Sequence, residues 1–389
     1  MTVSLWQADG TQPTHAVDFL VIGGGLVGSA AAYFAAQAGH TVTLVEAQDL
    51  AMGASGRNAG FMITGPDTYY HHAIARYGHD VTREIWQLSQ RTHAIWHMLA
   101  EGASVPMDQC GSLLLAESSD EAAELRLAAE ALHADGIDVI YHKRDPLNRG
   151  YFAAIEQPWD CAVQPAKLVE TVFRRSGAAL VNNSPVYAIE QTDTDRVIVH
   201  SRRVTFHARH VLLCTNAYSP LLHPYFKGKI TPTRAQVFVT EPLPKPLINT
   251  CGYSDYGYMY YRTTFDGRLL MGGGRKDFKA LENDTTDDRI TPEVQTRLEE
   301  YTRRHYPEAV GASGQVKVSR RWAGIMGFTA DGLPLVGRLP DMPGVGFAVG
   351  FTGHGLALGA GTAERAVRLL LHGDSPGAVD ARRLEQIMT

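Results

Sequence analysis

The sequence predicts an α/β protein, α+β overall, in which a βαβ domain is interleaved with a second domain of mixed or antiparallel sheet covered by helices. Two observations predict this architecture. A short apolar run, a glycine-rich turn and a helix of small residues follow one another near the N-terminus, and the same order returns near the C-terminus. Hairpin-like strand patterns fill the region between them. The chain of 389 residues is also longer than a single domain with one simple core, which favours two domains.

The first element is a strand over 18–22, "DFLVI", which "GGGLVG" follows directly. Gly23, Gly25 and Gly28 satisfy the pattern GxGxxG. A helix over 26–38 and a second strand, "TVTLVE", that ends in Glu46 complete the unit. Glycines in this order permit a tight turn and close approach to a pyrophosphate, and an acid about 20 residues on suits a ribose hydroxyl. The motif predicts a Rossmann-like dinucleotide site; the alternative is an ordinary glycine-rich turn.

The next stretch, "GASGRNAGF" over 53–61, distinguishes between the dinucleotides. Its small residues let the backbone approach a cofactor closely, and Ser55, Arg57 and Asn58 supply hydrogen-bond donors. NAD would not need such a run, whereas FAD is longer and must reach into a second domain. We therefore expect FAD, with an ordinary surface loop as the alternative for this stretch.

These motifs, together with "RRWAGIMGFTADGLPLVGR" and "GFAVGFTGHGLALGAG", resemble the D-amino-acid oxidase superfamily of FAD-dependent amine oxidoreductases. The resemblance runs from Asp18 to about Gly373. "SLWQA", "GASGRNAG", "YYRTTFDGRLLMGGG" and "RRWAG" are most similar to the gamma-glutamylputrescine oxidoreductase branch. Glycine oxidase and monomeric sarcosine oxidase look like more distant relatives.

The resemblance implies that several segments hold an extended FAD. It places Val186 at the adenine, "LLCTNAYS" near the phosphates, and the loop with His354 below the flavin pyrimidine. The helix expected over 356–371 also directs its N-terminus at that loop, where a reduced flavin is negative. For His354, a direct flavin role and a hydrogen bond to the loop backbone both stay open. The residues expected to bind FAD are Gly23, Gly25, Leu26, Val27, Gly28, Glu46, Ala47, Ala54, Ser55, Arg57, Asn58, Ala59, Gly60, Phe61, Val186, Cys214, Thr215, Gly324, Met326, Gly353, His354, Gly355 and Leu356.

The FAD segments lie at both ends and in the middle, so the two domains must interleave. We expect the FAD-binding domain at 1–88, 160–222 and 318–389, and the substrate domain at 89–159 and 223–317. In the substrate domain "SSDEAAELRLAAEALHADG" predicts an amphipathic helix. "RAQVFVTEP" and "GYMYYRTTFDGRLLMGGG" predict strands, with a turn at Asp266 and Gly267.

Tyrosines are concentrated in "GYSDYGYMYYR". In a single strand Tyr256, Tyr258 and Tyr260 share a face and form an aromatic wall for a cationic amine; packing on the core is the alternative. Amine oxidation by a flavin needs a neutral nitrogen. An apolar pocket supplies it by lowering the amine pKa, so no obligatory base is expected. The residues expected to act on the substrate are His354, Tyr258, Tyr260 and Arg262.

Several charged residues of the related enzymes are absent. Glycine oxidases carry a carboxylate-binding arginine at the position aligned with Met326, and sarcosine oxidases carry an arginine near Met62 and a lysine aligned with Ala357. The oxygen-activating lysine of sarcosine oxidases aligns with Leu270, and their flavin-linked cysteine aligns with Gly324. These differences imply noncovalent FAD and no assurance of fast reaction with oxygen.

The usual carboxylate anchors are thus missing. Arg57, Arg262 and Arg321 flank motifs near the expected cavity and are candidates to replace them; surface or structural pairing is the alternative.

The composition excludes other classes. The net charge of −5 disfavours nucleic acid as a partner, and Cys110, Cys161, Cys214 and Cys251 form neither a CxxC pair nor a Cys/His cluster, so no metal site is expected. No leader pattern and no unbroken run of about 18 apolar residues occurs, so we expect a cytoplasmic protein without a membrane span.

We therefore expect an FAD-dependent oxidoreductase that oxidises a C–N bond of a primary or secondary amine by hydride transfer to flavin N5, giving an imine that hydrolyses. Oxygen or another acceptor would reoxidise the flavin. One alternative is a glycine, D-amino-acid or N-methyl amino-acid oxidase or dehydrogenase that uses one of the arginines. Another is a flavin-binding protein without significant turnover.

Overall fold

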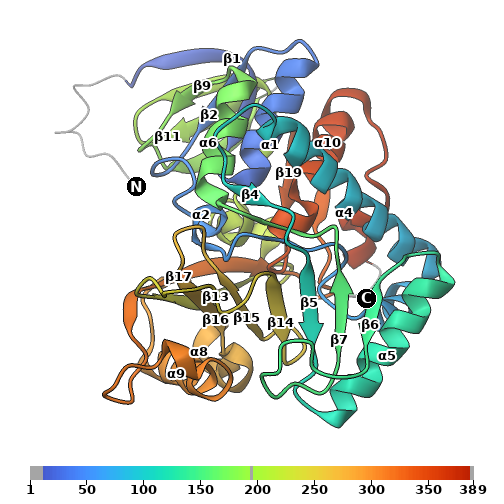
Figure 1. Ribbon diagram of the computed structural model, residues 1–389. Helices are drawn as coiled ribbons and strands as arrows, with labels where there is room; N and C mark the ends of the chain where they lie inside the picture. The colour runs from blue at the N-terminus through green and yellow to red at the C-terminus, as the bar shows by residue number, and fades with distance from the viewer. Residues whose placement is uncertain (1–11, 193–195, 386–389) are drawn as a thin grey trace.

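The computed structural model describes residues 12–192 and 196–385, which form two large sheets with helices packed against them (Figure 1). The "SLWQA" motif lies outside the described residues. Among the helices of this part of the chain, none combines the length and apolar character that a membrane crossing requires. The predicted α/β fold class, α+β overall, is confirmed.

The first sheet contains the predicted βαβ unit. Strands β1, β2 and β12 are parallel, and β9 and β19 extend the parallel part on either side. The central residues Phe19 to Ile22 are buried, which explains the unbroken apolar run. The strands are β1 (Thr14–Ile22), β2 (Val42–Val45), β9 (Ala179–Val181), β10 (Val186–Gln191), β11 (Val197–Ser201), β12 (Thr205–Leu213), β18 (Leu335–Leu339) and β19 (Met342–Val349).

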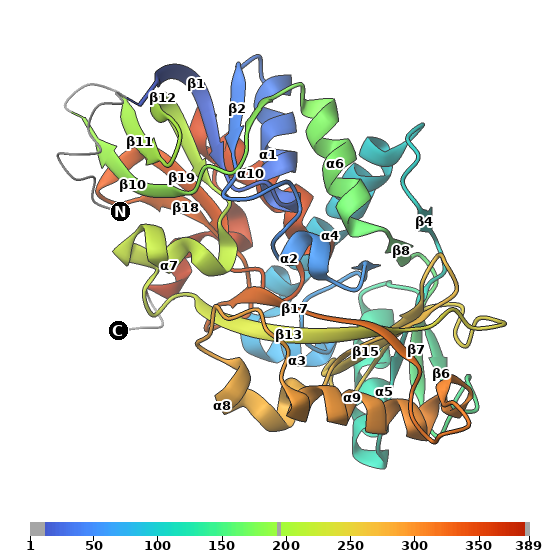
Figure 2. The same cartoon turned by 90° about the vertical axis from the view of Figure 1, so that its left-hand side faces the viewer.

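Long helices pack together on one side of this sheet, as Figure 2 shows. They are α1 (Leu26–Gln37), α4 (His79–Ala100), α6 (Pro165–Ser176) and α10 (Gly355–His372). Helix α10 contacts both α1 and α4, and Trp96 of α4 donates a 2.8 Å hydrogen bond to the carbonyl of Leu356. Gly361 allows this close packing, because a Cβ there would lie 2.7 Å from Leu88 Cδ1. The start of α10 is thereby fixed.

The second sheet has the order β17-β13-β16-β15-β14-β5-β7-β6 and is antiparallel except where β14 meets β5. The predicted mixed sheet and the hairpin around Asp266 and Gly267 are therefore confirmed. The strands are β5 (Ser112–Leu115), β6 (Ile140–His142), β7 (Ala154–Gln157), β13 (Thr231–Thr240), β14 (Cys251–Ser254), β15 (Met259–Thr263), β16 (Leu269–Gly273) and β17 (Val318–Phe328).

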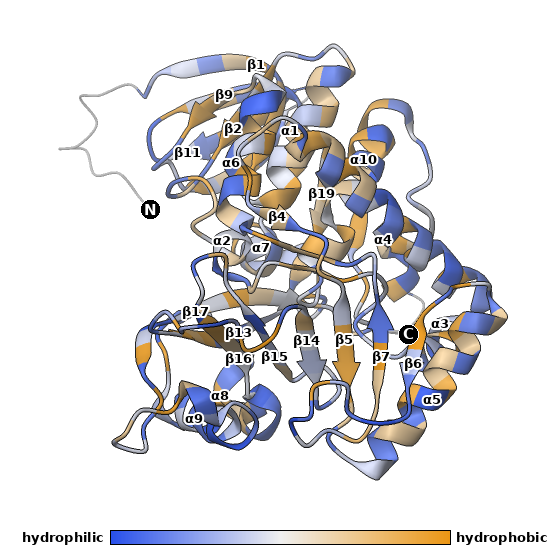
Figure 3. Ribbon diagram, in the orientation of Figure 1, coloured by the Kyte–Doolittle hydropathy of each residue, from blue (hydrophilic) through white to orange (hydrophobic). Residues whose placement is uncertain are grey.

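Helices cover this sheet as predicted. They are α5 (Ser119–Ala134), α8 (Lys279–Glu282) and α9 (Pro292–His305). The hydroxyl of Ser118 caps α5 by accepting a hydrogen bond from the backbone N–H of Glu121. Figure 3 shows mainly hydrophilic residues on α9 and a hydrophobic β19, as expected for a solvent-facing helix and a buried strand.

The remaining elements are short. They are α2 (Ala54–Arg57), α3 (Tyr70–Tyr77), α7 (Ser219–Leu222), β3 (Phe61–Met62), β4 (Met107–Asp108), β8 (Cys161–Val163), and the 3-10 helices η2 (Asn216–Tyr218), η3 (Pro224–Phe226), η4 (Arg275–Phe278), η5 (Pro307–Ala309), η6 (Gly377–Val379) and η7 (Ala381–Leu384). Three of them, β3, β8 and β4, form a third, three-stranded sheet.

Two sequence expectations change. The tyrosine-rich run is not one strand: Asp255, Tyr256 and Gly257 have positive φ and form the turn between β14 and β15. Tyr256 is therefore 44% exposed and does not share a strand face with Tyr260. Strand β17 pairs with β13 in the second sheet, whereas the sequence predicts that residues from 318 onward belong to the FAD-binding domain. We propose a domain boundary after Phe328 instead of at residue 318.

Asp160 should make stability depend on pH. It is fully buried and accepts hydrogen bonds from Thr64, Ser112 and Gln157. Burial raises its pKa to about 7, and those hydrogen bonds only partly oppose the rise. Since the folded-state pKa lies above the unfolded value, the stabilisation is complete below about pH 4 and is lost as the pH rises through about 7.

Asp160→Asn should therefore flatten the pH dependence of the free energy of unfolding between pH 4 and 7, measured by urea unfolding, by roughly 4 kcal/mol at most at about 1.4 kcal/mol per pKa unit. The exposed Asp138→Asn is the matched control. If stability changed with pH in the same way in the parent and in both variants, the raised pKa of Asp160 would be contradicted.

Candidate active site

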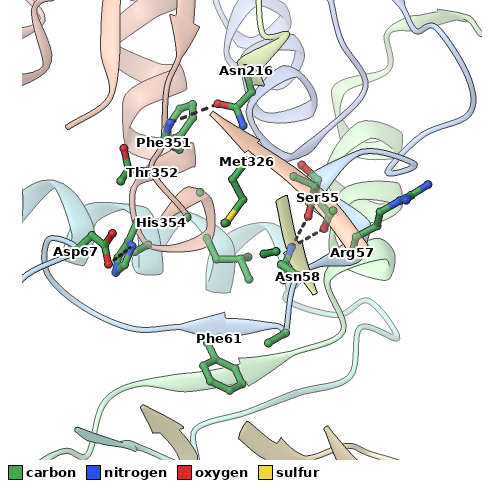
Figure 4. A pocket seen from close by; sticks show the side chains of 18 of the residues that line it. Ser55, Arg57, Asn58, Phe61, Asp67, Asn216, Met326, Phe351, Thr352 and His354 are labelled. Atoms are coloured by element: carbon green, nitrogen blue, oxygen red, sulfur yellow. Dashed lines mark hydrogen bonds and ion pairs between the residues drawn. The ribbon is translucent and has the colours of Figure 1, made fainter. Parts of the chain in front are cut away.

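One elongated cavity lies between the two sheets (Figure 4). The start of α1 forms one end and the loop before α10 forms another side, while β13 and β17 of the second sheet close it from the opposite direction. Its lining residues are Gly25, Leu26, Val27, Ala54, Ser55, Arg57, Asn58, Ala59, Phe61, Ile63, Asp67, Cys214, Asn216, Ala235, Val237, Tyr253, Gly257, Tyr258, Tyr260, Arg275, Gly324, Met326, Phe328, Phe351, Thr352, Gly353, His354, Gly355, Leu356 and Ala357.

The glycines at the start of α1 leave no room for side chains. A Cβ on Gly28 would lie 1.9 Å from the carbonyl oxygen of Gly23, so only glycine permits this strand–helix contact. A Cβ on Gly25 would point at Ser55 Oγ, 2.5 Å away, at the edge of the cavity. These contacts fit a dinucleotide phosphate group, which needs bare backbone beside a helix N-terminus.

Glu46 is fixed at the end of β2. Its Oε2 accepts a 2.6 Å hydrogen bond from the N–H of Gly24, and its Oε1 accepts a 2.9 Å bond from the N–H of Gln48. The carboxylate thus lies directly beside the glycine turn. A remaining lone pair suits a ribose hydroxyl, as the sequence predicts.

The loop before α10 opens a second helix N-terminus toward the cavity. Thr352 and Gly353 have positive φ values of 46° and 85°, which turn the chain sharply. Among the described residues no side chain caps the 18-residue helix, and its first residues, Gly355, Leu356 and Ala357, line the cavity. This end of the cavity favours negative charge.

His354 lies beside Asp67, with 3.6 Å between His354 Nδ1 and Asp67 Oδ1 (Figure 4). Burial raises the pKa of Asp67, and the charges of His354 and Arg275 oppose this effect. The Asp67 side chain still keeps 32% of its surface accessible because it faces the cavity. Sequence reasoning missed Asp67, which follows a proline in a loop and belongs to no motif.

Three tyrosines form the aromatic wall, but not the three expected from a single strand. Tyr253 and Tyr260 lie opposite each other on β14 and β15, and each packs edge-to-face on Phe61. Tyr258 joins them from the turn. Directly opposed residues of an antiparallel pair share a face, which brings Tyr253 into the wall in place of Tyr256.

Most residues predicted to bind FAD line this cavity. Those that do not are Gly23, Gly28, Glu46, Ala47, Gly60, Val186 and Thr215. Gly23, Gly28 and Glu46 lie directly behind the helix N-terminus. Gly60 packs against Val163, where a Cβ would lie 2.1 Å from the carbonyl oxygen. Assignment of Ala47 and Val186 to the adenosine end stays a prediction.

The three arginines proposed as anchors have other partners. The Arg57 guanidinium turns away from the cavity to Asp288 at 2.5 Å (Figure 4). Arg321 pairs with Glu299 at 2.5 Å. Arg262 is 5% exposed, does not line the cavity, and donates to the carbonyl of Val163. The structure therefore does not bring Arg262 to the cavity, because the backbone of β8 and Gly60 covers it.

Arg275 also lines the cavity, and sequence reasoning missed it. It follows β16 at the start of η4, and its guanidinium carbon lies 4.8 Å from the ring centres of Tyr258 and Phe328. The signal was present, because Arg275 directly follows "MGGG" at the end of a strand that pairs with the tyrosine-bearing β15.

FAD should be released intact by acid precipitation. Gly324 has no side chain that could form a covalent bond to flavin. A Cβ at this position would lie 3.2 Å from Arg57 Cβ. Precipitated protein should leave the colour in the supernatant as FAD, identified by mass. A pellet that keeps its yellow colour would contradict noncovalent binding.

Comparison with known proteins agrees with this geometry. A gamma-glutamylputrescine oxidoreductase of Escherichia coli strain K12 is 27% identical over 92% of this chain and 84% of that protein. A glycine oxidase of Bacillus licheniformis is 25% identical over 91% of this chain and 93% of that protein. A solved L-alpha-glycerophosphate oxidase of Mycoplasma pneumoniae with FAD bound has a TM-score of 0.72 at 19% identity, covering 92% of this chain and 95% of that chain.

The predicted resemblance, enzyme class and cofactor are thereby confirmed. The DAO family, described as FAD dependent oxidoreductase, matches residues 18–369, which is most of the chain. The glycine turn, the N-terminus of α10 and the cavity between them are the parts that would hold FAD. The protein is an FAD-dependent enzyme, and the chain belongs to the DAO family of FAD-dependent oxidoreductases.

Proposed function

We propose that this enzyme oxidises a C–N bond of a primary or secondary amine bound in the cavity between the two sheets. The observation that carries the proposal is the meeting of an aromatic wall and an uncapped helix N-terminus in the cavity that fits the cofactor. FAD supplies the two-electron acceptor, and the resulting imine would hydrolyse in water.

The residues of the chain prepare the amine for this reaction. Tyr253, Tyr258, Tyr260 and Phe61 surround it with aromatic surface and exclude water, which lowers the pKa of a bound amine and favours the neutral form. Burial raises the pKa of Tyr260 to about 12, so this hydroxyl stays protonated at neutral pH and does not take a proton from the amine. The wall therefore binds and orients the substrate.

The relatives support this function. Their names describe action on gamma-glutamylputrescine and glycine. In both compounds the amine nitrogen is bonded to a carbon that carries hydrogen. Oxidation of an amino acid is the second candidate, because Arg275 provides a cation in the cavity. A cytoplasmic location and reoxidation by oxygen or another acceptor belong to the proposal; the described cysteines are free thiols, as in a reducing compartment.

Turnover with a panel of compounds tests the proposal. Purified enzyme would be offered amines, N-methyl amines and amino acids, with either oxygen or a redox dye as acceptor, and carbonyl product would be measured. We expect at least one amine-bearing compound to give carbonyl in step with acceptor reduction. Absence of product from the whole panel, with FAD fully bound, would refute the function.

A further inference from the structure

Two cysteines lie side by side behind the aromatic wall of the cavity. The Sγ atoms of Cys110 and Cys251 are 4.0 Å apart and share a hydrogen bond. Neither residue lines the cavity, but both pack in the same apolar cluster as Tyr253 and Tyr260 of the wall. Cys251 is fully buried, whereas Cys110 is partly exposed and can therefore meet a small solute from outside.

The backbone fixes the two cysteines as neighbours. Cys251 is the first residue of β14, and its N–H donates a 3.2 Å hydrogen bond to the carbonyl of Gly111, the residue after Cys110. Gly111 has a φ of 72°, so the chain turns there as it enters β5. An S–S bond is about 2.05 Å long, so the two sulfurs would have to approach each other by about 2 Å. Rotation about one Cα–Cβ bond moves a sulfur by a comparable distance.

A buried arginine near this pair has unused hydrogen-bond donors. Arg262 is 5% exposed, and its Nη2 donates a 3.2 Å hydrogen bond to the carbonyl of Val163. Its Nε and Nη1 are buried and have no hydrogen-bond partner in the part of the chain that the structure describes. The side chains whose negative charge would stabilise this cation are Cys251 and Cys110. Because a buried cation without a counter-charge is costly, Arg262 favours an anion at the cysteines.

Cys110 is the member of the pair that carries this negative charge. The hydrogen bond from Cys251 lowers the pKa of the Cys110 thiol to about 7, and the charge of Arg262 acts in the same direction, against burial and the charge of Asp108. Burial raises the pKa of Cys251, which therefore stays a thiol and donates its hydrogen bond to Cys110. The thiolate is the form of cysteine that attacks an oxidant.

We propose that Cys110 and Cys251 are a redox-active dithiol that hydroperoxides convert to a disulfide. The Cys110 thiolate attacks one oxygen of hydrogen peroxide; an S–O bond forms, the O–O bond breaks, and the leaving hydroxide takes up the proton that Cys110 lost. Cys251 then attacks the Cys110 sulfur; the S–S bond forms, the S–O bond breaks, and the oxygen leaves as water with the proton of Cys251. Two electrons pass from the two sulfurs to the peroxide, which becomes two molecules of water. Arg262 is the positioning residue that stabilises the thiolate.

Oxidation of the holoenzyme by hydrogen peroxide tests the proposal. Reduced protein would be treated with a small excess of peroxide at neutral pH and unfolded, its remaining thiols would be alkylated, and its peptides would be identified by mass. We expect a disulfide between Cys110 and Cys251 that dithiothreitol removes, with Cys161 and Cys214 still reduced. No substrate is added, so the result does not depend on the proposed function.

Two variants separate the roles of the sulfurs. Cys251→Ala should stop the reaction at the sulfenic acid of Cys110, which dimedone would trap as an adduct identified by mass. Cys161→Ala is the matched control: Cys161 is equally buried and its carbonyl accepts a 3.8 Å hydrogen bond from the Cys251 thiol, but its own sulfur contacts His97. This variant should form the same disulfide as the parent.

The pH profile of Cys110 alkylation tests the role of Arg262. In the folded parent the rate of modification of Cys110 by iodoacetamide should reach half its maximum at a pH of about 7. In Arg262→Met this midpoint should move upward, toward the value of about 8.5 of a free thiol. Arg262→Lys keeps the charge and should move the midpoint less.

The proposal would be overturned if Cys110 and Cys251 stayed reduced under peroxide, or if either formed its disulfide with Cys161 or Cys214 instead. An alkylation midpoint that is the same in the parent and in Arg262→Met would overturn the role of Arg262.

Discussion

Gly25→Val should yield a folded protein without bound FAD. The backbone of Gly25 has a φ of −91°, which any residue adopts, so the obstacle is space and not conformation. A Cβ there lies 2.5 Å from Ser55 Oγ, which accepts the 2.9 Å hydrogen bond from the N–H of Leu26. Two further methyl groups would fill the edge of the cavity where a pyrophosphate must meet the backbone.

The ratio of flavin absorbance to protein absorbance after purification measures the effect. Gly25→Ala should lose less flavin than Gly25→Val. The double variant Gly25→Ala with Ser55→Ala should regain part of the lost flavin content, because alanine at position 55 removes the Oγ atom that the new Cβ would collide with. Ala38→Val adds bulk at the exposed far end of α1 and should retain full flavin content. Flavin content equal to the parent in Gly25→Val would disprove this placement of the cofactor.

Arg234→Met should lower the free energy of unfolding by about 3 to 5 kcal/mol, the usual cost of leaving a buried charge unpaired. Arg234 lies on β13 and is 5% exposed, and Glu282 of α8 is fully buried. Two hydrogen bonds of 2.9 Å join the guanidinium to the carboxylate. Without Arg234, Glu282 keeps only neutral partners, including Gln236 at 3.0 Å.

Urea unfolding of the purified variant would measure this loss. Arg289→Met is the control, because Arg289 forms an exposed ion pair with Asp287 and should unfold at the parent's midpoint. The double variant Arg234→Met with Glu282→Leu should recover much of the stability, since it removes both charges. An unchanged midpoint in Arg234→Met would show that the ion pair does not hold β13 and α8 together.

The sequence predicted those parts of the fold that local chemistry determines. The strand, glycine turn, helix and acid over 18–46 follow from apolar periodicity and from contacts that only glycine permits, and all are present. Helix α5 and the hairpin of β15 and β16 around Asp266 were also predicted correctly from local sequence patterns. The position of strand β17 could not be predicted, because it pairs with β13 across 78 to 97 residues of sequence, from Thr240 with Val318 to Thr231 with Phe328.

The substrate side of the site could be predicted only in part. The tyrosine-rich run indicated an aromatic wall, but the positive φ of Tyr256 breaks the strand and exchanges Tyr256 for Tyr253. Which arginine reaches the cavity depends on distant partners: Asp288 draws Arg57 away and Glu299 draws Arg321 away. Arg275 enters because glycine allows close contact with the Tyr258 backbone, which no local pattern shows.

The central claim is that the enzyme oxidises a C–N bond with its own FAD, and single-turnover reduction tests it most directly. The holoenzyme would be mixed anaerobically with amines and amino acids, and in parallel with glycerol phosphate, since the same fold occurs in an L-alpha-glycerophosphate oxidase. We predict that an amine-bearing compound bleaches the flavin and gives one carbonyl product per flavin reduced. Bleaching by the hydroxyl compound alone, with every amine inert, would contradict the account.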